Sequence, residues 1–223
     1  GNYPTGTDNV ALGDTALDDG SLSGANNTAI GSAALTANTS GTNNAAVGSN
    51  ALAANTTGQS NTAVGVCALS TNTTSNSLTA VGFCALSAST GAGNTAVGDR
   101  ALRLNTTGAS NSGVGYLSLW SNTSGNYNTA LGGSSLRYNT TASNNVAVGH
   151  SSLCANTTGA SNIAVGKDAL LVNTTGATNI AVGKDALYAN TTAVSNVAVG
   201  TGTLCTTTTG SSNTALGECA MKA

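Results

Sequence analysis

A single glycine that follows an aliphatic residue recurs along the whole chain with an almost constant 17-residue period. The interval is longer by one position before Gly31 and shorter by one position before Gly98. A constant period is the signature of an architecture in which each repeat packs on its neighbours. The glycines are Gly13, Gly31, Gly48, Gly65, Gly82, Gly98, Gly115, Gly132, Gly149, Gly166, Gly183, Gly200 and Gly217.

The consensus of the repeat is N-T-A-V-G-x-x-A-L-x-x-N-T-T-G-x-S, and we count positions from its first glycine as zero. Asn occupies −4 and Ala occupies −2 in twelve of the thirteen copies, and −1 is always Val, Ile or Leu. Leu occupies +4 except in the last copy, which has Met221. A helix pair needs a repeat of about 33 residues or more, and N-T-T-G is turn chemistry. The repeat therefore predicts an all-β fold.

The period predicts a β-solenoid (β-roll) of about thirteen 17-residue coils. Two strands of about five residues and two turns account for one coil, which gives a flat coil with two sheets about 10 Å apart. Such a thin interior suits Ala, Val and Leu, and aromatic residues make up only 3% of the chain. We expect an N-terminal lead over residues 1–8, with Pro4, and a single solenoid domain over residues 9–223.

Stacking would place equivalent residues of successive coils in columns about 4.8 Å apart. The Asn column at −4 is expected to form an amide ladder at a turn, broken locally by Leu78. The glycine column is expected to mark a bend with positive φ, where a Cβ would clash. The predicted ladder comprises Asn44, Asn61, Asn94, Asn111, Asn128, Asn145, Asn162, Asn179 and Asn196.

Both faces of the strand that precedes the glycine are restricted in sequence. Positions −2 and −1 point to opposite faces, yet one is nearly always Ala and the other is always aliphatic. We infer that one sheet faces another subunit through the −2 face; the alternative is that Ala merely fits a tight bend. The variable positions +1, +2, +5, +6, +11 and +12 are expected to face solvent, and they carry Arg100, Trp120, Arg137, Lys167 and Asp168.

Composition excludes several classes of function. Charged residues make up 6% of the chain and the net charge is −2, whereas nucleic-acid binding requires clustered Lys and Arg. No apolar run approaches the length of roughly 18 residues that a membrane-spanning helix needs. We therefore expect no insertion into a membrane.

No catalytic constellation can be assembled from the sequence. The one His, His150, is expected to be an ordinary surface residue, and we predict no enzyme activity and no cofactor. Asp8, Asp14, Asp18 and Asp19 cluster near the N-terminus, where calcium binding is conceivable, but their spacing fits no known loop and we predict no metal site. The K-D pairs at Lys167 and Lys184 read as a surface charge ladder.

The five cysteines do not follow a zinc pattern. Cys67 and Cys84 both occupy +2 in consecutive coils, so their Cα atoms would lie about 4.8 Å apart, inside the disulfide range of roughly 4.4–6.8 Å. They could form a disulfide, or they could remain small apolar free thiols. Cys154 and Cys205 share +5 but lie three coils apart, and Cys219 has no neighbour.

Nine asparagines at +7 begin the pattern N-x-S/T, which accepts glycans in a secretory pathway. The pattern also reads as a turn motif repeated for structural reasons, and we favour that interpretation. The nine are Asn38, Asn55, Asn72, Asn105, Asn122, Asn139, Asn156, Asn173 and Asn190.

The consensus, as in Asn61–Gly65 with Ala68–Leu69 and Asn72–Thr74, resembles the repeats of viral and phage tail-fibre proteins. Its A-V-G-x-x-A portion is similar to the head repeats of trimeric autotransporter adhesins, which form a trimeric left-handed β-roll. The resemblance covers essentially the whole chain. It implies an extracellular location, on a cell surface or a virion surface.

We therefore expect a non-catalytic structural or adhesive module of an extracellular filament or virion fibre. Self-association as a homotrimer, an end-to-end filament or both is expected, with a surface glycan or receptor as a further partner. Because neither end of the repeat array is fully capped, we also expect an end-on junction with another copy or with a further domain. Two alternatives stay open: an ice-binding solenoid with Thr at +8 and +9, and a carbohydrate-binding or carbohydrate-cleaving β-helix.

Overall fold

A computed structural model describes residues 6–221 of the chain, so residues 1–5 of the predicted lead lie outside the described part. The chain divides into two compact units, residues 1–110 and residues 111–223, which are described separately. The described residues contain thirteen short strands and no helix. The all-β class is therefore confirmed.

Each strand covers positions −3 to −1 of one repeat, so it ends just before the repeat glycine. In the first unit the strands are β1 (Val10–Leu12), β2 (Thr28–Ile30), β3 (Ala45–Val47), β4 (Thr62–Val64), β5 (Thr79–Val81) and β6 (Thr95–Val97). In the second unit they are β7 (Ser112–Val114), β8 (Thr129–Leu131), β9 (Val146–Val148), β10 (Ile163–Val165), β11 (Ile180–Val182), β12 (Val197–Val199) and β13 (Thr214–Leu216).

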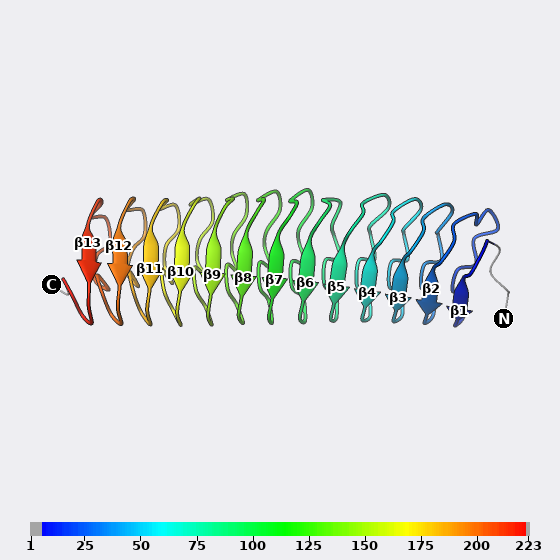
Figure 1. Ribbon diagram of the computed structural model, residues 1–223, viewed down its shortest axis with the longest axis horizontal. Coiled ribbons are helices and arrows are strands. Elements are labelled where there is room, and N and C mark those ends of the chain that lie inside the picture. Colours follow the sequence, from blue (N-terminus) through cyan, green and yellow to red (C-terminus); the bar gives the residue numbers. More distant parts are fainter. Residues whose placement is uncertain (1–5, 222–223) are drawn as a thin grey trace. The chain divides into compact units, whose positions relative to one another are not determined.

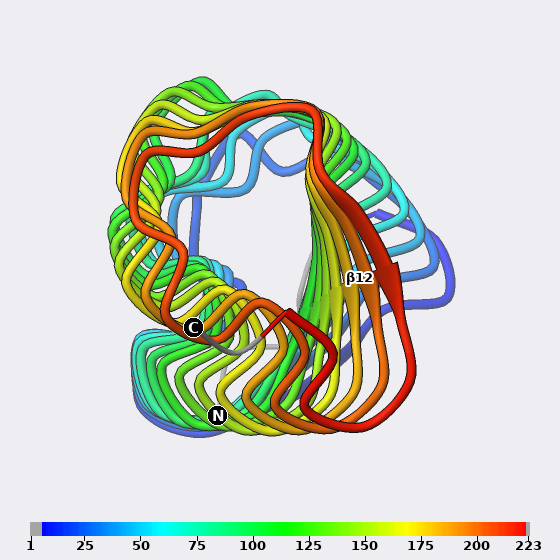
Figure 2. The same ribbon diagram turned by 90° about the vertical axis from the view of Figure 1, so that its left-hand side faces the viewer.

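Successive strands within a unit pair in parallel and in register, position for position. Ala164 of β10 lies between Ala147 of β9 and Ala181 of β11, and Figure 1 shows the strands of each unit side by side in sequence order. Seen end-on in Figure 2, the coils of each unit repeat one shape, and each coil is rotated slightly from the one before it. This is the geometry of a β-solenoid with one repeat per coil, as the period predicts.

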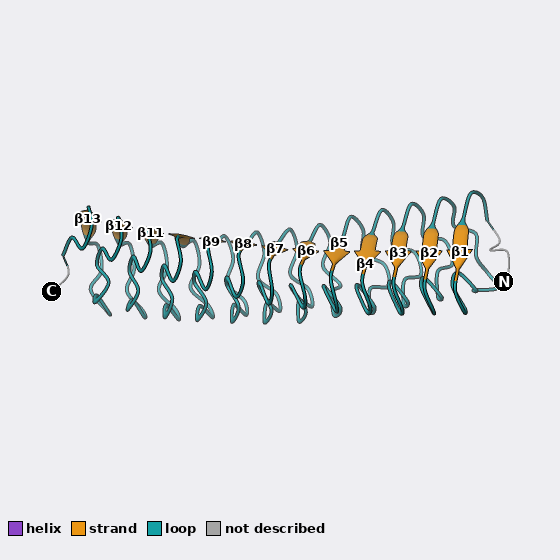
Figure 3. Cartoon of the chain, turned by 90° about the horizontal axis from the view of Figure 1, so that it is seen from below, coloured by secondary structure: helices purple, strands orange, loops and turns teal. Residues whose placement is uncertain are grey.

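The predicted pair of five-residue strands in each coil is wrong. Each coil has a single strand of three residues, and turns make up the rest, as Figure 3 shows. The reason is a set of left-handed backbone conformations after the strand. In one coil Asp168 at +2 has φ 57° and Leu170 at +4 has φ 52°, and residues in that region cannot continue an extended strand.

The glycine column has the conformation that the sequence predicts. Its φ values run from 118° to 139°. A Cβ built on Gly166 would lie 2.5 Å from the carbonyl oxygen of Gly183 in the next coil. Coils can therefore approach closely at this bend only when the residue has no side chain.

Three columns of residues fill the interior of the coils: Ala at −2, Ala, Ser or Thr at +3, and Leu at +4. Leu153, Leu170 and Leu187, for example, are fully buried. Each buried Leu contributes roughly 1.5–3 kcal/mol. The same residues keep their left-handed φ because backbone bonds to the next coil hold them: the Leu170 N–H donates to the carbonyl of Ala186 at 3.0 Å.

Candidate functional surfaces

The predicted Asn residues at −4 lie in buried columns within each unit, and their amides bond to the next coil. The Asn145 Oδ1 accepts from the backbone N–H of Asn162 at 2.9 Å, and its Nδ2 donates to the carbonyl of Gly159 at 3.0 Å. Its own N–H donates to the Oδ1 of Asn128 at 3.0 Å. The same arrangement recurs elsewhere, for example at Asn44, Asn61, Asn128, Asn162, Asn179 and Asn196. Each amide thus joins adjacent coils.

Leu78 interrupts this column less than its apolar side chain suggests. Its backbone N–H still donates to the Asn61 Oδ1 at 3.0 Å. The Asn94 Nδ2 donates to two carbonyls at 2.8 Å, that of Gly108 and that of Gly91 in the preceding, shortened coil. The shortened coil therefore lets the next asparagine supply the donor that Leu78 lacks.

A second amide ladder, which the sequence analysis missed, runs through the asparagines at +7. The Asn156 Nδ2 donates to the Asn139 Oδ1 at 3.0 Å and to the carbonyl of Gly159 at 2.9 Å. All nine of these asparagines are at most 1% exposed. Their amide nitrogens are therefore inaccessible in the folded coil, which supports the interpretation of the N-x-S/T pattern as a structural turn motif. The signal was present as the near-invariance of Asn at +7.

The threonines at +8 are also engaged within the solenoid. Their hydroxyls donate to a backbone carbonyl of the next coil, as Thr157 does to Thr174 at 3.0 Å and Thr174 to Thr191 at 3.1 Å. The threonines at +9, such as Thr158 and Thr175, are exposed in the same turn. The two expected threonine columns therefore differ in their availability to solvent.

The strand faces point the opposite way from our prediction. Ala147, Ala164 and Ala181 at −2 are fully buried inside their own coil, so the predicted contact through the −2 face is wrong. Positions −3 and −1 point outward, and we call them the outer strand face. Ile163 is 38% exposed and Val114 is 38% exposed on this face.

The outer strand face is most apolar over strands β9–β12. Most strands before β9 have Thr at −3, whereas these four have Val or Ile at both outward positions. The result is a continuous group of β-branched aliphatic side chains, which we call the aliphatic patch. It consists of Val146, Val148, Ile163, Val165, Ile180, Val182, Val197 and Val199.

Cys67 and Cys84 are adjacent in the first unit. Burial raises the pKa of the Cys84 thiol, and the neighbouring Cys67, which shares a hydrogen bond with it, raises it further. Both thiols are free, as are those of Cys154, Cys205 and Cys219. The predicted proximity of Cys67 and Cys84 is confirmed, and a disulfide between them stays a prediction.

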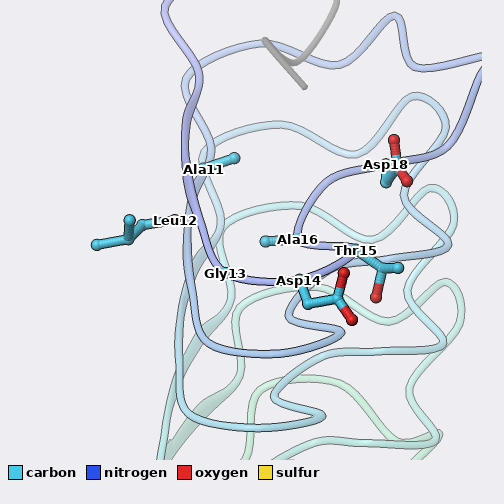
Figure 4. A pocket seen from close by; sticks show the side chains of 7 residues that line it. All are labelled: Ala11, Leu12, Gly13, Asp14, Thr15, Ala16 and Asp18. Carbon is cyan, nitrogen blue, oxygen red and sulfur yellow. The ribbon is translucent and has the colours of Figure 1, made fainter. Parts of the chain in front are cut away.

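The N-terminal carboxylates are dispersed. Asp14 and Asp18 line a hollow of about 360 Å³ at the first coil, with their carboxylates apart from each other (Figure 4). Asp19 accepts hydrogen bonds from the hydroxyl and the N–H of Ser21, which lower the pKa of its carboxyl group. Within residues 6–221 no group of three His, Cys, Asp or Glu side chains could hold a metal ion.

His150 is exposed, and its Nδ1 lies 3.0 Å from the hydroxyl of Ser151, its neighbour in the chain. Asp168 in the next coil pairs with Lys167 at 3.2 Å, and in the described part of the chain no carboxylate pairs with the imidazole. The contacts therefore do not make up a nucleophile, base and orienting acid.

A cationic and aromatic cluster occupies the variable positions of the second unit. The Arg137 guanidinium lies 5.9 Å from the centroid of the Trp120 ring and 5.0 Å from that of the Tyr138 ring. Burial raises the pKa of the Cys154 thiol in the next coil, and the Arg137 charge opposes that effect. In the first unit, Arg100 stacks on Phe83 at 5.3 Å.

The sequence matches no protein-family model and no curated protein. No helix in residues 6–221 has the length and hydropathy to cross a bilayer. The fold and the surfaces described above are therefore the basis for assigning a function.

Proposed function

We propose that the chain is a non-catalytic structural or adhesive module of an extracellular filament or virion fibre, and that it associates with copies of itself through the outer strand face. The observation that carries the proposal is the half-exposed aliphatic column at −1, which is present in every repeat. This position points outward from its own coil and is partly exposed, for example 38% at Val64 and 40% at Leu131. Its restriction to Val, Ile and Leu points to a partner.

The aliphatic patch is the strongest part of this face. Eight outward β-branched side chains together expose on the order of a few hundred Å² of apolar surface, the size at which patches mark interaction sites. The patch contains no charged residue. A second copy is the occupant that we propose, because equivalent columns with the same spacing between coils can meet around a symmetry axis.

The rest of the coil supports a mechanical role. Two buried amide ladders, at −4 and +7, join each coil to the next within a unit, together with the parallel strand pairing. Such bonding distributes a load over many repeats. The ice-binding alternative has less support because the +8 hydroxyls donate to protein carbonyls rather than being available to ordered water.

Sedimentation velocity of a charged variant tests the proposal. Val165→Lys with Val182→Lys places two charges in the aliphatic patch, and we expect the assembly to dissociate into smaller species. Thr158→Lys with Thr175→Lys is the matched control, since both threonines are exposed in the +9 turn, and it should sediment like the unmodified chain. Equal sedimentation of both variants and the unmodified chain would contradict the proposed contact.

A further inference from the structure

The least repetitive side chains of the array are concentrated in a few coils. All three arginines of the chain lie between residues 100 and 137, and its single tryptophan is Trp120. Arg103, Trp120 and Arg137 occupy +5 in three consecutive copies, where the first copies carry smaller residues such as Thr36 and Ala53, and Tyr138 occupies +6. Large side chains here are a departure from a solenoid that is otherwise built mostly from small ones.

Among residues 6–221, no carboxylate pairs with the Arg137 guanidinium. The ion pairs recorded in residues 6–221 involve Arg100, Lys167 and Lys184, and none reaches Arg137. The Nε of Arg137 and the Nε1 of Trp120 are also buried without a hydrogen-bond partner among the described residues. Unpaired buried donors are unfavourable, and because both atoms are closed to solvent a ligand would contact the exposed parts of the cluster rather than these two atoms.

The geometry favours a ligand with one negative charge and an apolar ring face. The Arg137 guanidinium lies close to both the Trp120 and the Tyr138 rings, and a guanidinium is suited to bind a planar carboxylate. Tyr138 is 43% exposed beside that cation, so it is accessible to a ligand. A nucleic acid is disfavoured, because one guanidinium on a chain of net charge −2 cannot compensate a run of phosphates.

We propose that Trp120, Arg137 and Tyr138 bind a carboxylate-bearing sugar. The carboxylate accepts hydrogen bonds from the Arg137 guanidinium, and the C–H face of the sugar ring packs on Tyr138. The inference rests on the proposed adhesive function and names the class of glycan that the module would recognise. Uronic acids and sialic acids both present this chemistry.

Fluorescence titration provides a direct test, because Trp120 is the only tryptophan in the chain. The probes are a galacturonic acid oligomer, sialyllactose, neutral lactose and a glutamate-rich peptide. We expect a saturable change with at least one of the two acidic sugars and none with lactose or the peptide. The sugar that binds distinguishes a uronic from a sialic acid ligand.

Two variants and one control make the test specific. Arg137→Gln and Tyr138→Ala should each weaken the Kd about tenfold, and Arg137→Lys should weaken it by less. Tyr188→Ala removes an aromatic residue at the same +5 position as Arg137 in another coil of the same unit, and it should bind like the unmodified chain. Circular dichroism of each variant checks that the solenoid is folded.

The inference is overturned if neither acidic sugar gives a saturable signal, if lactose binds equally, if the peptide binds instead, or if folded Arg137→Gln binds unchanged. Sedimentation of the same samples separates this result from the proposed self-association. Loss of sugar binding with intact assembly in Arg137→Gln supports the site. Sugar binding by a chain that remains monomeric would overturn the self-association alone.

Discussion

Replacing Asn128 and Asn145 with Leu should destabilise the solenoid strongly, and the contacts give the size of the effect. The Asn128 Oδ1 accepts from the backbone N–H of residue 145, and the Asn145 Oδ1 accepts from that of Asn162. The double substitution leaves two buried N–H groups unpaired. The carbonyl of Gly159 is not orphaned, because Asn156 also donates to it at 2.9 Å.

An unpaired buried N–H costs about 1–3 kcal/mol, so the double variant should lose about 2–6 kcal/mol of unfolding free energy. Urea unfolding at a fixed protein concentration measures the loss. Thr141→Leu with Thr158→Leu introduces the same side chains at exposed +9 positions and should change the free energy little. If the Asn variant unfolds at the same urea concentration as this control, the ladder does not hold the coils together.

Three further predictions follow from other columns of the repeat. Gly166→Ala should destabilise the solenoid by several kcal/mol in thermal unfolding, because the φ of Gly166 is 134° and the new Cβ would lie 2.5 Å from a carbonyl oxygen of the next coil. An unchanged melting temperature would exclude the tight bend. If folding precedes glycan transfer, expression through a glycosylating secretory pathway should leave Asn55 and Asn156 unmodified, since both amides are buried. Intact-mass analysis measures this, and quantitative glycosylation of a folded product would contradict the ladder at +7. Oxidised glutathione should convert Cys67 and Cys84 to an internal disulfide, releasing two molecules of reduced glutathione. Because burial raises the pKa of the Cys84 thiol, the reaction should be slow at neutral pH and accelerate as pH rises. Tryptic mapping that finds only mixed disulfides at these residues would refute the pairing.

Much of this architecture is readable from the period and from the residues that recur. A 17-residue interval, a glycine that needs positive φ and an asparagine fixed at −4 predict stacked coils with a close bend and a polar column. The short strand could not be foreseen, because a left-handed Leu such as Leu170 contradicts the intrinsic preference of that residue. Burial and bonding to the next coil impose that conformation, and these are long-range effects.

The repeat also did not indicate which face of the strand points into the coil. Alternation assigns Ala164 and Val165 to opposite faces, but it does not say which face is inside. We inferred that the Ala at −2 faces another subunit. The coil instead uses its interior for Leu at +4 and leaves room only for Ala beneath the strand, so the valines lie outside.

In the candidate sites, too, some contacts follow from the repeat positions and others do not. The adjacency of Cys67 and Cys84 follows from their equal repeat positions, and so does the stacking of Arg137 on Trp120. The absence of an ion pair at Arg137 among the described residues, and its contact with Tyr138, depend on side-chain directions at the turn. Sequence periodicity does not determine those directions.

Electron cryomicroscopy of the purified assembly tests the central claim most directly. We predict that copies of the chain contact one another through the outer strand face, with Val165, Val182 and their neighbours in strands β9–β12 buried between subunits. Single, unassociated chains in the images, or an assembly in which these valines face solvent and the contacts lie elsewhere, would contradict the account.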